Sequence, residues 1–285
     1  MTLKYQLKTD SLIGGRAQNQ DCCGSGETAH GLLVIVCDGM GGASGGKTAS
    51  KLAVKTIWDY VRDADTGEAG MILTDAIREA NKRVYQTGQN DAALKGMGTT
   101  VVALLIDPHK ATAAHAGDSR IYQLRKRRKV FRTFDHSLVF ELVKRGAITE
   151  EQARLSAESN VIMRAIGIKP DIDVDVTRNL SYRKGDRFLL CSDGVSGAIP
   201  EKQLLRLIRH APTVEETVQN MMQTVDQTGK DAGGKHDNLT AALIEMHQHS
   251  ILKPKMTQTA KIVAGIVTGL VMIILCVIVY LILKK

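Results

Sequence analysis

Aspartate side chains recur at separated chain reversals along this sequence, and several directly follow a short apolar run that is typical of a β-strand. Carboxylate oxygens are the ligands that hard divalent cations such as Mg²⁺ and Mn²⁺ prefer. If the strand ends meet, the carboxylates would form a metal cage. The aspartates concerned are Asp21, Asp38, Asp118, Asp193 and Asp237.

Two of these aspartates share one local pattern, in which an apolar run is followed by aspartate and glycine. Asp38 opens DGMGG, and Asp193 lies in SDG. An Asp-Gly pair alone is commonly just a turn. Glycine also lets the backbone approach a ligand closely, and the Gly39 carbonyl could itself bind a metal. Each motif is weak alone, so the argument rests on their combination and order.

The elements that must position these residues are predicted from hydrophobic patterning. Short runs joined by tight turns favour antiparallel sheets, and helices come in pairs between the hairpins, which indicates α+β layers rather than βαβ units. A segment at about 136–175 has few apolar runs and is interpreted as a flap near the site. Strands are expected at 32–37, 99–106, 111–117, 121–124, 130–134, 187–192 and 239–246, and helices at 48–61, 71–86, 200–210 and 214–228.

The net charge of +8 over 285 residues first suggests nucleic-acid binding, but its distribution argues against that class. No acidic residue follows Glu245, whereas five lysines do, so the part before them carries only +3 (8 − 5). Aromatic residues make up 4% of the chain and do not alternate with the basic residues, as single-strand binders require. The basic run 125–129 is interpreted as a solvated hairpin turn, with anionic lipid or an acidic partner as alternatives.

The five cysteines show no zinc spacing and no disulfide framework, which fits a reducing compartment. The polar N-terminus lacks the apolar region of a signal peptide. Residues 262–283 hold no charge over 22 positions, enough for one transmembrane helix across ~30 Å of hydrocarbon. The sequence therefore predicts a single-pass C-terminal anchor with a cytoplasmic catalytic domain. Gly265 and Gly269 form a GxxxG pair that could support a weak dimer.

Seven motifs in order resemble the metal-dependent protein phosphatases of type 2C (PPM), in their bacterial form. The resemblance covers roughly residues 8 to 246. It implies a catalytic domain over 1–246. The mostly polar stretch 247–261 is interpreted as a linker to the transmembrane helix predicted over 262–283 from its uncharged sequence. The motifs are Arg16 with Asp21, DGMGG from Asp38, GTT from Gly98, GDSR from Gly117, DHS from Asp135, SDG from Ser192 and Asp237-Asn238.

The resemblance implies a four-layer α-β-β-α sandwich of two antiparallel sheets and a binuclear Mn²⁺ or Mg²⁺ centre. Asp38 would bridge the two cations, and Gly39 would offer its carbonyl to one of them. Asp193 and Asp237 would bind the first cation, and Asp21 would hold the second. Asp118, with Asp193, would hold a weaker third cation.

By the same resemblance, Arg16 would grip the substrate phosphate, and a hydroxide shared by two cations would attack phosphorus in line. The implied enzyme is a protein serine/threonine phosphatase that acts on phosphoproteins and opposes a serine/threonine kinase. Met40 replaces a histidine that some relatives are proposed to use as general acid, which leaves His236 as a candidate proton donor. The simpler expectation for His236 is a solvated histidine in a loop. His136 is expected to order structure near the flap.

Two other classes stay open at this point. One is a membrane-anchored pseudophosphatase that acts as a phospho-binding scaffold, although a pure binder need not keep every aspartate. The other is a metal-dependent phosphodiesterase or nuclease with a similar cage. Metal-dependent hydrolysis of a phosphate monoester separates the phosphatase from both.

Overall fold

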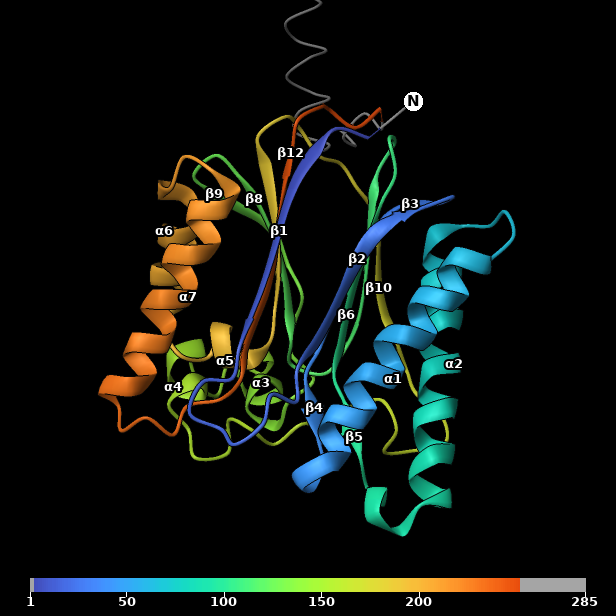
Figure 1. The fold of residues 1–285 in the computed structure, drawn as a ribbon. Coiled ribbons are helices and arrows are strands. Elements are labelled where there is room, and N and C mark those ends of the chain that lie inside the picture. The colour runs from blue at the N-terminus through green and yellow to red at the C-terminus, as the bar shows by residue number, and fades with distance from the viewer. Residues whose placement is uncertain (1–2, 252–285) are drawn as a thin grey trace, which may run out of the picture. The chain divides into compact units, whose positions relative to one another are not determined.

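The computed structural model describes residues 3–251, and Figure 1 shows two β-sheets between two layers of helices. The predicted linker beyond Ile251, the predicted span 262–283 and the pair Gly265/Gly269 lie outside the described residues. None of the helices within residues 3–251 is long and apolar enough to cross a bilayer.

Sheet I is antiparallel and has the order β1-β12-β11-β8-β9. It joins the start of the chain to its last described strand, because β1 pairs with β12 along its whole length. The β8–β9 pair is the hairpin predicted on either side of the basic run. The strands are β1 (Tyr5–Leu12), β8 (Arg120–Arg125), β9 (Arg128–Arg132), β11 (Asp186–Cys191) and β12 (Leu239–Met246).

Sheet II is also antiparallel and has the order β10-β7-β6-β3-β2. A separate two-stranded pair, β4 with β5, lies beyond the end of β3. The strands of sheet II are β2 (Cys22–Thr28), β3 (Gly31–Cys37), β6 (Val101–Ile106), β7 (Ala111–Ala116) and β10 (Asp175–Leu180), and the short pair is β4 (Gly39–Met40) and β5 (Gly98–Thr99).

Two pairs of long helices cover the outer faces of the sandwich (Figure 1). Helices α1 (Gly42–Asp63) and α2 (Ala69–Asn90) pack on sheet II, and α6 (Glu201–His210) and α7 (Val214–Asp231) pack on sheet I. A single 3₁₀ turn, η1 (Ala92–Leu94), follows α2. Three short helices, α3 (Leu138–Lys144), α4 (Glu150–Arg154) and α5 (Asp193–Ser196), lie at one end of the sandwich (Figure 1). The described fold is therefore the predicted α+β sandwich of two antiparallel sheets.

Strand β3 explains why the central strands have continuous apolar sequences. Its residues alternate between two environments, because successive side chains of a strand point to opposite faces. Leu32, Val34 and Val36 face the other sheet. The alternate residues Leu33, Ile35 and Cys37 face the helices α1 and α2. Both faces are buried, so no polar residue interrupts the run.

Three strands of sheets I and II have no counterpart in the predicted set, namely β1, β2 and β10. Each lies at the edge of its sheet. Strands β1 and β10 have polar, partly exposed residues along their length. Strand β2 reads CCGSGET, and its glycines leave room for Val54 and Trp58 of α1. These three edge strands have one face exposed to solvent, so they lack the apolar run that revealed the central strands.

The segment interpreted as a flap holds α3 and α4 followed by irregular chain up to β10. Helix α4 begins with a capping box, in which Thr149 and Gln152 satisfy each other's backbone N–H groups. Isolated bridges tie the segment down where Ser137 pairs with Ile162 and Thr99 with Ile166. The segment is thus attached to the sandwich beside β5.

Candidate active site

The five predicted aspartates lie at one end of the sandwich, where strands of both sheets start or stop. Asp38 follows β3, Asp21 precedes β2, and Asp118 follows β7. Asp193 follows β11, and Asp237 lies two residues before β12. Antiparallel pairing of Cys22 with Cys37 and of Cys191 with Ala241 brings these strand ends together. Residues separated by more than 200 positions in the chain therefore share one site.

The GTT motif holds the backbone of Asp38 in place. The carbonyl oxygen of Asp38 accepts hydrogen bonds from the Thr100 N–H and the Thr99 hydroxyl, both at 2.8 Å. The Asp38 N–H donates to the Thr100 hydroxyl at 3.0 Å. That hydroxyl lies 2.7 Å from the Ser119 hydroxyl, which connects Asp38 to the turn that carries Asp118. These contacts show how the threonine pair of the GTT motif supports Asp38 and the turn that carries Asp118.

Gly194 allows the chain after β11 to approach the chain before β12. A Cβ atom at this position would lie 2.0 Å from the Asn238 carbonyl oxygen, closer than atoms can pack. The close approach sets Asp193 beside Asp237. Nearby, the Ser192 hydroxyl donates to Oδ2 of Asp21 at 2.8 Å and accepts from the Thr240 N–H at 3.0 Å.

Asn238 fixes the loop between β1 and β2. Its amide donates to the carbonyl oxygens of Ile13 at 2.7 Å and Gln18 at 3.0 Å, and its Oδ1 accepts from the Gln20 N–H at 2.8 Å. The same loop carries Arg16, whose guanidinium donates to Oδ2 of Asp237 at 2.8 Å. Arg16 thus lies at the edge of the acidic cluster with about half of its side chain exposed.

The electrostatics of the cluster are unfavourable without a counter-charge. Burial, followed by the charges of Asp193 and Asp21, raises the pKa of Asp38 well above its ordinary value. Burial and Asp193 do the same to the pKa of Asp118. Burial raises the pKa of Asp21 to about 6, although hydrogen bonds from Thr240 and Ser192 oppose the shift. Every one of these groups would be stabilised in its charged form by a bound cation.

Three carboxylate oxygens of the cluster are buried without any hydrogen-bond partner among the described residues. They are Oδ1 of Asp21, Oδ1 of Asp118 and Oδ1 of Asp193. An unpartnered buried polar atom is costly, and native proteins rarely leave several in one place. Converging hard oxygen donors with unused lone pairs fit divalent cations such as Mg²⁺ and Mn²⁺.

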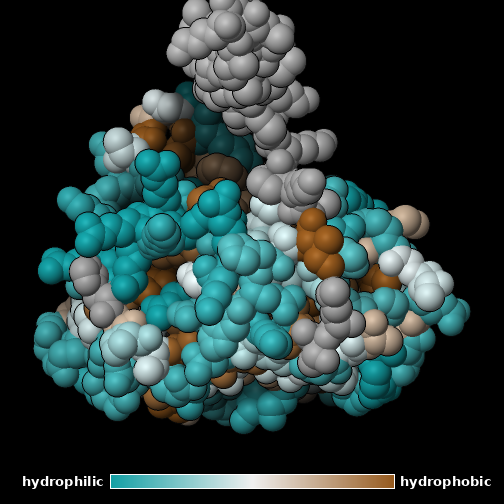
Figure 2. Space-filling view, turned by 90° about the horizontal axis from the view of Figure 1, so that it is seen from above, coloured by the Kyte–Doolittle hydropathy of each residue, from teal (hydrophilic) through white to brown (hydrophobic). Residues whose placement is uncertain are grey.

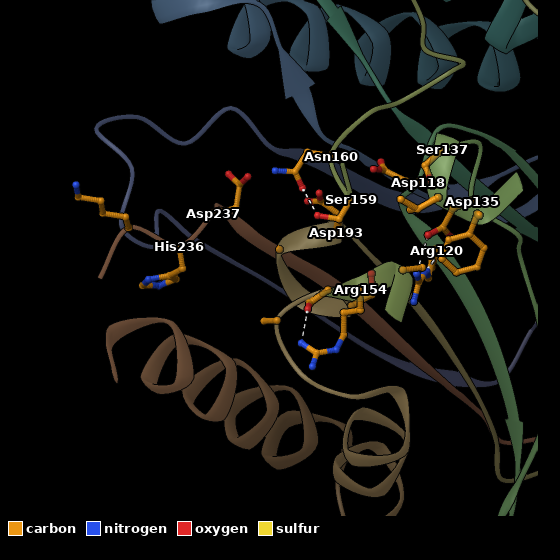
Figure 3. Close-up of a pocket in the computed structure, with 18 of the residues that line it drawn as sticks. Asp118, Arg120, Asp135, Ser137, Arg154, Ser159, Asn160, Asp193, His236 and Asp237 are labelled. Atoms are coloured by element: carbon orange, nitrogen blue, oxygen red, sulfur yellow. Dashed lines mark hydrogen bonds and ion pairs between the residues drawn. The ribbon is translucent and has the colours of Figure 1, made fainter. Parts of the chain in front are cut away.

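Two hollows flank the cluster and share Arg16, Asn160, Asp193 and Asp237 in their walls. One hollow, of about 300 Å³, extends under α3 and α4, and Figure 3 shows Asp118, Asp193 and Asp237 around it. The other, of about 620 Å³, extends over the DGMGG turn past Met40. Asn160 comes from the flap, so the flap contributes a side chain to both hollows.

The GDSR and DHS motifs meet in a buried ion pair that the sequence did not reveal. Arg120 donates to both carboxylate oxygens of Asp135 at 2.8 and 2.6 Å. The guanidinium also lies 5.0 Å from the centre of the Phe140 ring in α3. Because both charges are almost fully buried, the pair fixes the start of the flap against β8.

His236 is not directed at the acidic cluster. Its Nε2 lies 2.9 Å from Oδ1 of Asp226 in α7, and Figure 3 shows its ring turned away from Asp237. The side chain is only 12% exposed, so the expectation of a solvated loop histidine is wrong. The general-acid interpretation of His236 receives no support from this orientation.

His136 orders the flap, as predicted from the DHS motif. Its Nδ1 accepts from the Gly117 N–H at 3.1 Å, which places the proton of the neutral ring on Nε2. Nε2 lies 3.3 Å from Asp175 and 3.2 Å from Arg164. Burial, His115 and Arg164 lower the pKa of His136 to about 4, so the ring is neutral at pH 7.

His115, His136 and Asp175 form a second group whose potential ligand atoms lie within 4.8 Å of one another. The two rings stack with centroids 4.6 Å apart. His115 bonds through Nε2 to the Phe134 carbonyl oxygen, and Nε2 of His136 carries the proton that Asp175 accepts. These roles describe a hydrogen-bonded support for the flap.

The fold and the converging carboxylates define an α-β-β-α sandwich with an acidic site at one end. The family model described as "Protein phosphatase 2C" matches residues 10–244. This chain belongs to the protein phosphatase 2C family. The family predicted from the seven motifs is therefore confirmed.

Named relatives agree with this assignment. The serine/threonine phosphatase stp of Listeria monocytogenes is 33% identical over 217 residues, covering 75% of this chain and 84% of the relative. The protein phosphatase PhpP of Streptococcus pneumoniae is 34% identical over 237 residues, covering 82% of this chain and 94% of the relative.

Solved structures show the same fold. The serine/threonine phosphatase Stp1 of Staphylococcus aureus superposes with a TM-score of 0.75 at 30% identity, covering 86% of this chain and 96% of that one. The catalytic domain of PstP, in complex with two manganese ions, superposes with a TM-score of 0.72 at 31% identity, covering 86% of this chain and 99% of that one. The prediction of a protein serine/threonine phosphatase agrees with these names.

Proposed function

We propose that this protein hydrolyses phosphoserine and phosphothreonine in proteins with the help of divalent cations, Mn²⁺ or Mg²⁺. The observation that carries the proposal is the cluster of buried aspartates, which repel one another and leave three carboxylate oxygens without partners. The named phosphatases above, and the manganese-bound PstP domain, support the same conclusion.

Each aspartate has a proposed place in the cation site. Asp38 is proposed to bridge two cations, because its charge interacts with those of Asp193, Asp21 and Asp118. Asp193 and Asp237 would bind the first cation, and Asp21 the second. The Gly39 carbonyl and Asp118, which adjoins Asp193, complete the proposed set, with Asp118 serving a third and weaker cation.

The cations would supply the charge that stabilises phosphate oxygens and a water activated for attack on phosphorus. Arg16 would orient the substrate phosphate. Its guanidinium has five N–H donors, and only one hydrogen bond, to Asp237, is formed within the described residues. Its planar fork suits two phosphate oxygens at once.

Protonation of the leaving serine or threonine oxygen needs a source other than Met40, which has no proton to give. His236 bonds to Asp226 instead of facing the cluster. Both hollows beside the cluster open to solvent, so we propose that water in the site delivers this proton. The two flanking hollows would accept the peptide on either side of the phosphorylated residue.

We further propose that residues 262–283 anchor the enzyme to a membrane, with the catalytic domain in the cytoplasm and a serine/threonine kinase acting on the same substrates. The uncharged run in the sequence supports the anchor. A weak dimer through Gly265 and Gly269 belongs to the same proposal. The scaffold and nuclease interpretations are not favoured, since every predicted carboxylate takes part in the cluster.

A phosphate-release assay tests the enzymatic proposal. The 1–251 domain is expected to dephosphorylate a phosphothreonine peptide in Mn²⁺ and to lose that activity in EDTA. Asp38→Ala is expected to abolish turnover, while Asp173→Asn, an exposed change in the flap, should leave it intact. A folded wild-type domain without metal-dependent phosphate release would exclude the proposal.

A further inference from the structure

The end of sheet I opposite the acidic cluster carries a concentration of positive charge. Three neighbouring segments contribute it, namely the start of β1, the β8–β9 turn and the β10–β11 turn. Figure 2 looks down on this end of the molecule, where hydrophilic residues cover much of the surface. We call the following exposed residues the basic edge: Lys4, Lys126, Arg127, Arg128, Arg183 and Lys184.

Strand pairing makes the basic edge continuous. Asp186 pairs with Arg125 at the ends of β11 and β8, and Tyr5 pairs with Met246 at the ends of β1 and β12. The Gly185 N–H also donates to the Met246 carbonyl oxygen at 2.7 Å. Five adjacent strands at ~4.8 Å spacing span roughly 19 Å, so the six side chains lie along one rim.

The charge of the basic edge is not neutralised within the described residues. None of its six side chains has an ion pair or a hydrogen bond there, whereas the acidic groups nearby are already engaged. Asp186 pairs with Arg125 at 2.7 Å, and Glu245 pairs with Arg187 at 2.6 Å. Surface lysines and arginines usually occur among acidic neighbours, so six unpaired cations on one rim indicate an anionic partner.

The path of the chain identifies which anionic partner reaches this rim. The last described residues leave the domain at the same end, where the Ile251 N–H donates to the Pro108 carbonyl oxygen at 3.1 Å. Ten residues, 252–261, then separate the domain from the uncharged run 262–283, and fully extended they span at most ~35 Å. They include Lys253, Lys255 and Lys261 and no acidic residue.

We propose that the basic edge docks on the anionic headgroups of a membrane and orients the catalytic site away from it. Strand β12 has eight residues, so the aspartate cluster lies about 26 Å from the docked end and faces the aqueous side. The opposite part of the same end has no comparable excess of positive charge, because Arg62 and Arg178 at the α1–α2 loop are paired with Asp63 at 2.7 Å and Glu68 at 3.1 Å. Sheet I would therefore lie closer to the lipid than the helices α1 and α2 that pack on sheet II.

Binding of the 1–251 domain to lipid vesicles tests the proposal, because this domain lacks the uncharged run 262–283. This part folds on its own, because it holds all the described hydrophobic clusters and corresponds to solved domains that it covers by 96% or more. The domain is expected to sediment with vesicles containing 30% phosphatidylserine and not with pure phosphatidylcholine vesicles. Binding should fall steeply between low and physiological salt, since exposed charges are screened over ~8 Å.

A matched pair of variants assigns the binding to the rim. K126Q/R127Q/K184Q removes three charges from the basic edge and should weaken binding to anionic vesicles at least tenfold, given about fivefold for each fully docked charge. K51Q/K82Q/K95Q removes three exposed, unpaired charges elsewhere and should weaken it less than twofold. Both variants should hydrolyse p-nitrophenyl phosphate at the wild-type rate, which confirms that they are folded.

Hydrogen exchange of the full chain in nanodiscs gives the orientation. The amides of 125–129 and 183–185 should exchange more slowly in anionic than in neutral nanodiscs, and those of 63–68 should not change. Equal losses in the two triple variants, absence of binding to anionic vesicles, or binding only to an acidic protein such as polyglutamate would each overturn the proposal. A loss of phosphatase activity alone would bear on the proposed function and not on this docking.

Discussion

Substitution of Asp21 by asparagine tests whether the acidic cluster is strained in the absence of cations. Burial raises the pKa of Asp21 from 3.8 to about 6. A carboxyl group whose pKa is raised in the folded state stabilises the fold fully below pH ~4, and that stability is lost as the pH rises through ~6. The shift of about two units corresponds to roughly 3 kcal/mol of lost stability at neutral pH.

Asparagine has nearly the same shape and no charge. Its Oδ1 can still accept the hydrogen bond that the Ser192 hydroxyl gives to Asp21 at 2.8 Å. In EDTA at pH 7.5, Asp21→Asn is therefore expected to stabilise the 1–251 domain by up to ~3 kcal/mol, or about 6–12 °C in Tm. At pH 4 most of the gain should be lost, because the folded-state carboxyl of Asp21 is then neutral as well.

Thermal unfolding followed by circular dichroism measures these shifts, with Asp173→Asn as the exposed control. In saturating Mn²⁺ the order of the two Tm values should reverse, because the wild type binds the cation through the Asp21 carboxylate, which the variant lacks. A lower Tm for Asp21→Asn in EDTA at pH 7.5, or the same gain at pH 4, would refute the reasoning. The cluster would then be a hydrogen-bonded structural site.

Three further substitutions probe how the site is positioned. Asn238→Ala removes the bonds to Ile13, Gln18 and Gln20, at about 1 kcal/mol each, so urea unfolding should report a loss of ~2–3 kcal/mol and Mn²⁺ titration a weaker activation. Gly194→Ala forces a Cβ against the Asn238 carbonyl oxygen, so differential scanning fluorimetry should show a Tm several degrees lower, and an unchanged Tm would contradict the close approach. Arg16→Lys loses the planar fork while keeping the charge, so steady-state kinetics should show KM raised about tenfold or more with little change in Tm, and an unchanged KM would remove Arg16 from phosphate binding.

The central strands were predictable because they are buried on both faces. Strands β3, β6, β11 and β12 read as continuous apolar runs, and each lies inside its sheet. The edge strands β1, β2 and β10 were not found, because their polar residues and glycines resemble loop sequence. Their pairing is decided by contacts with distant parts of the chain, such as β1 with β12.

The aspartates of the site were predictable from their positions after apolar runs, but their supports were not. Asn238 and Thr100 act through hydrogen bonds to residues far along the chain, which spacing alone does not reveal. The direction of His236 is likewise set by Asp226, ten residues earlier on α7. The flap was recognised by its lack of apolar runs, whereas the buried Arg120–Asp135 pair that holds it needed the structure.

The most direct measurement of the central claim is an anomalous difference map at the manganese edge from crystals grown in Mn²⁺. The account predicts strong peaks among Asp38, Asp193, Asp21 and Asp237, with a weaker peak beside Asp118. Manganese bound only at His115, His136 and Asp175, or no ordered manganese in crystals of active protein, would contradict it.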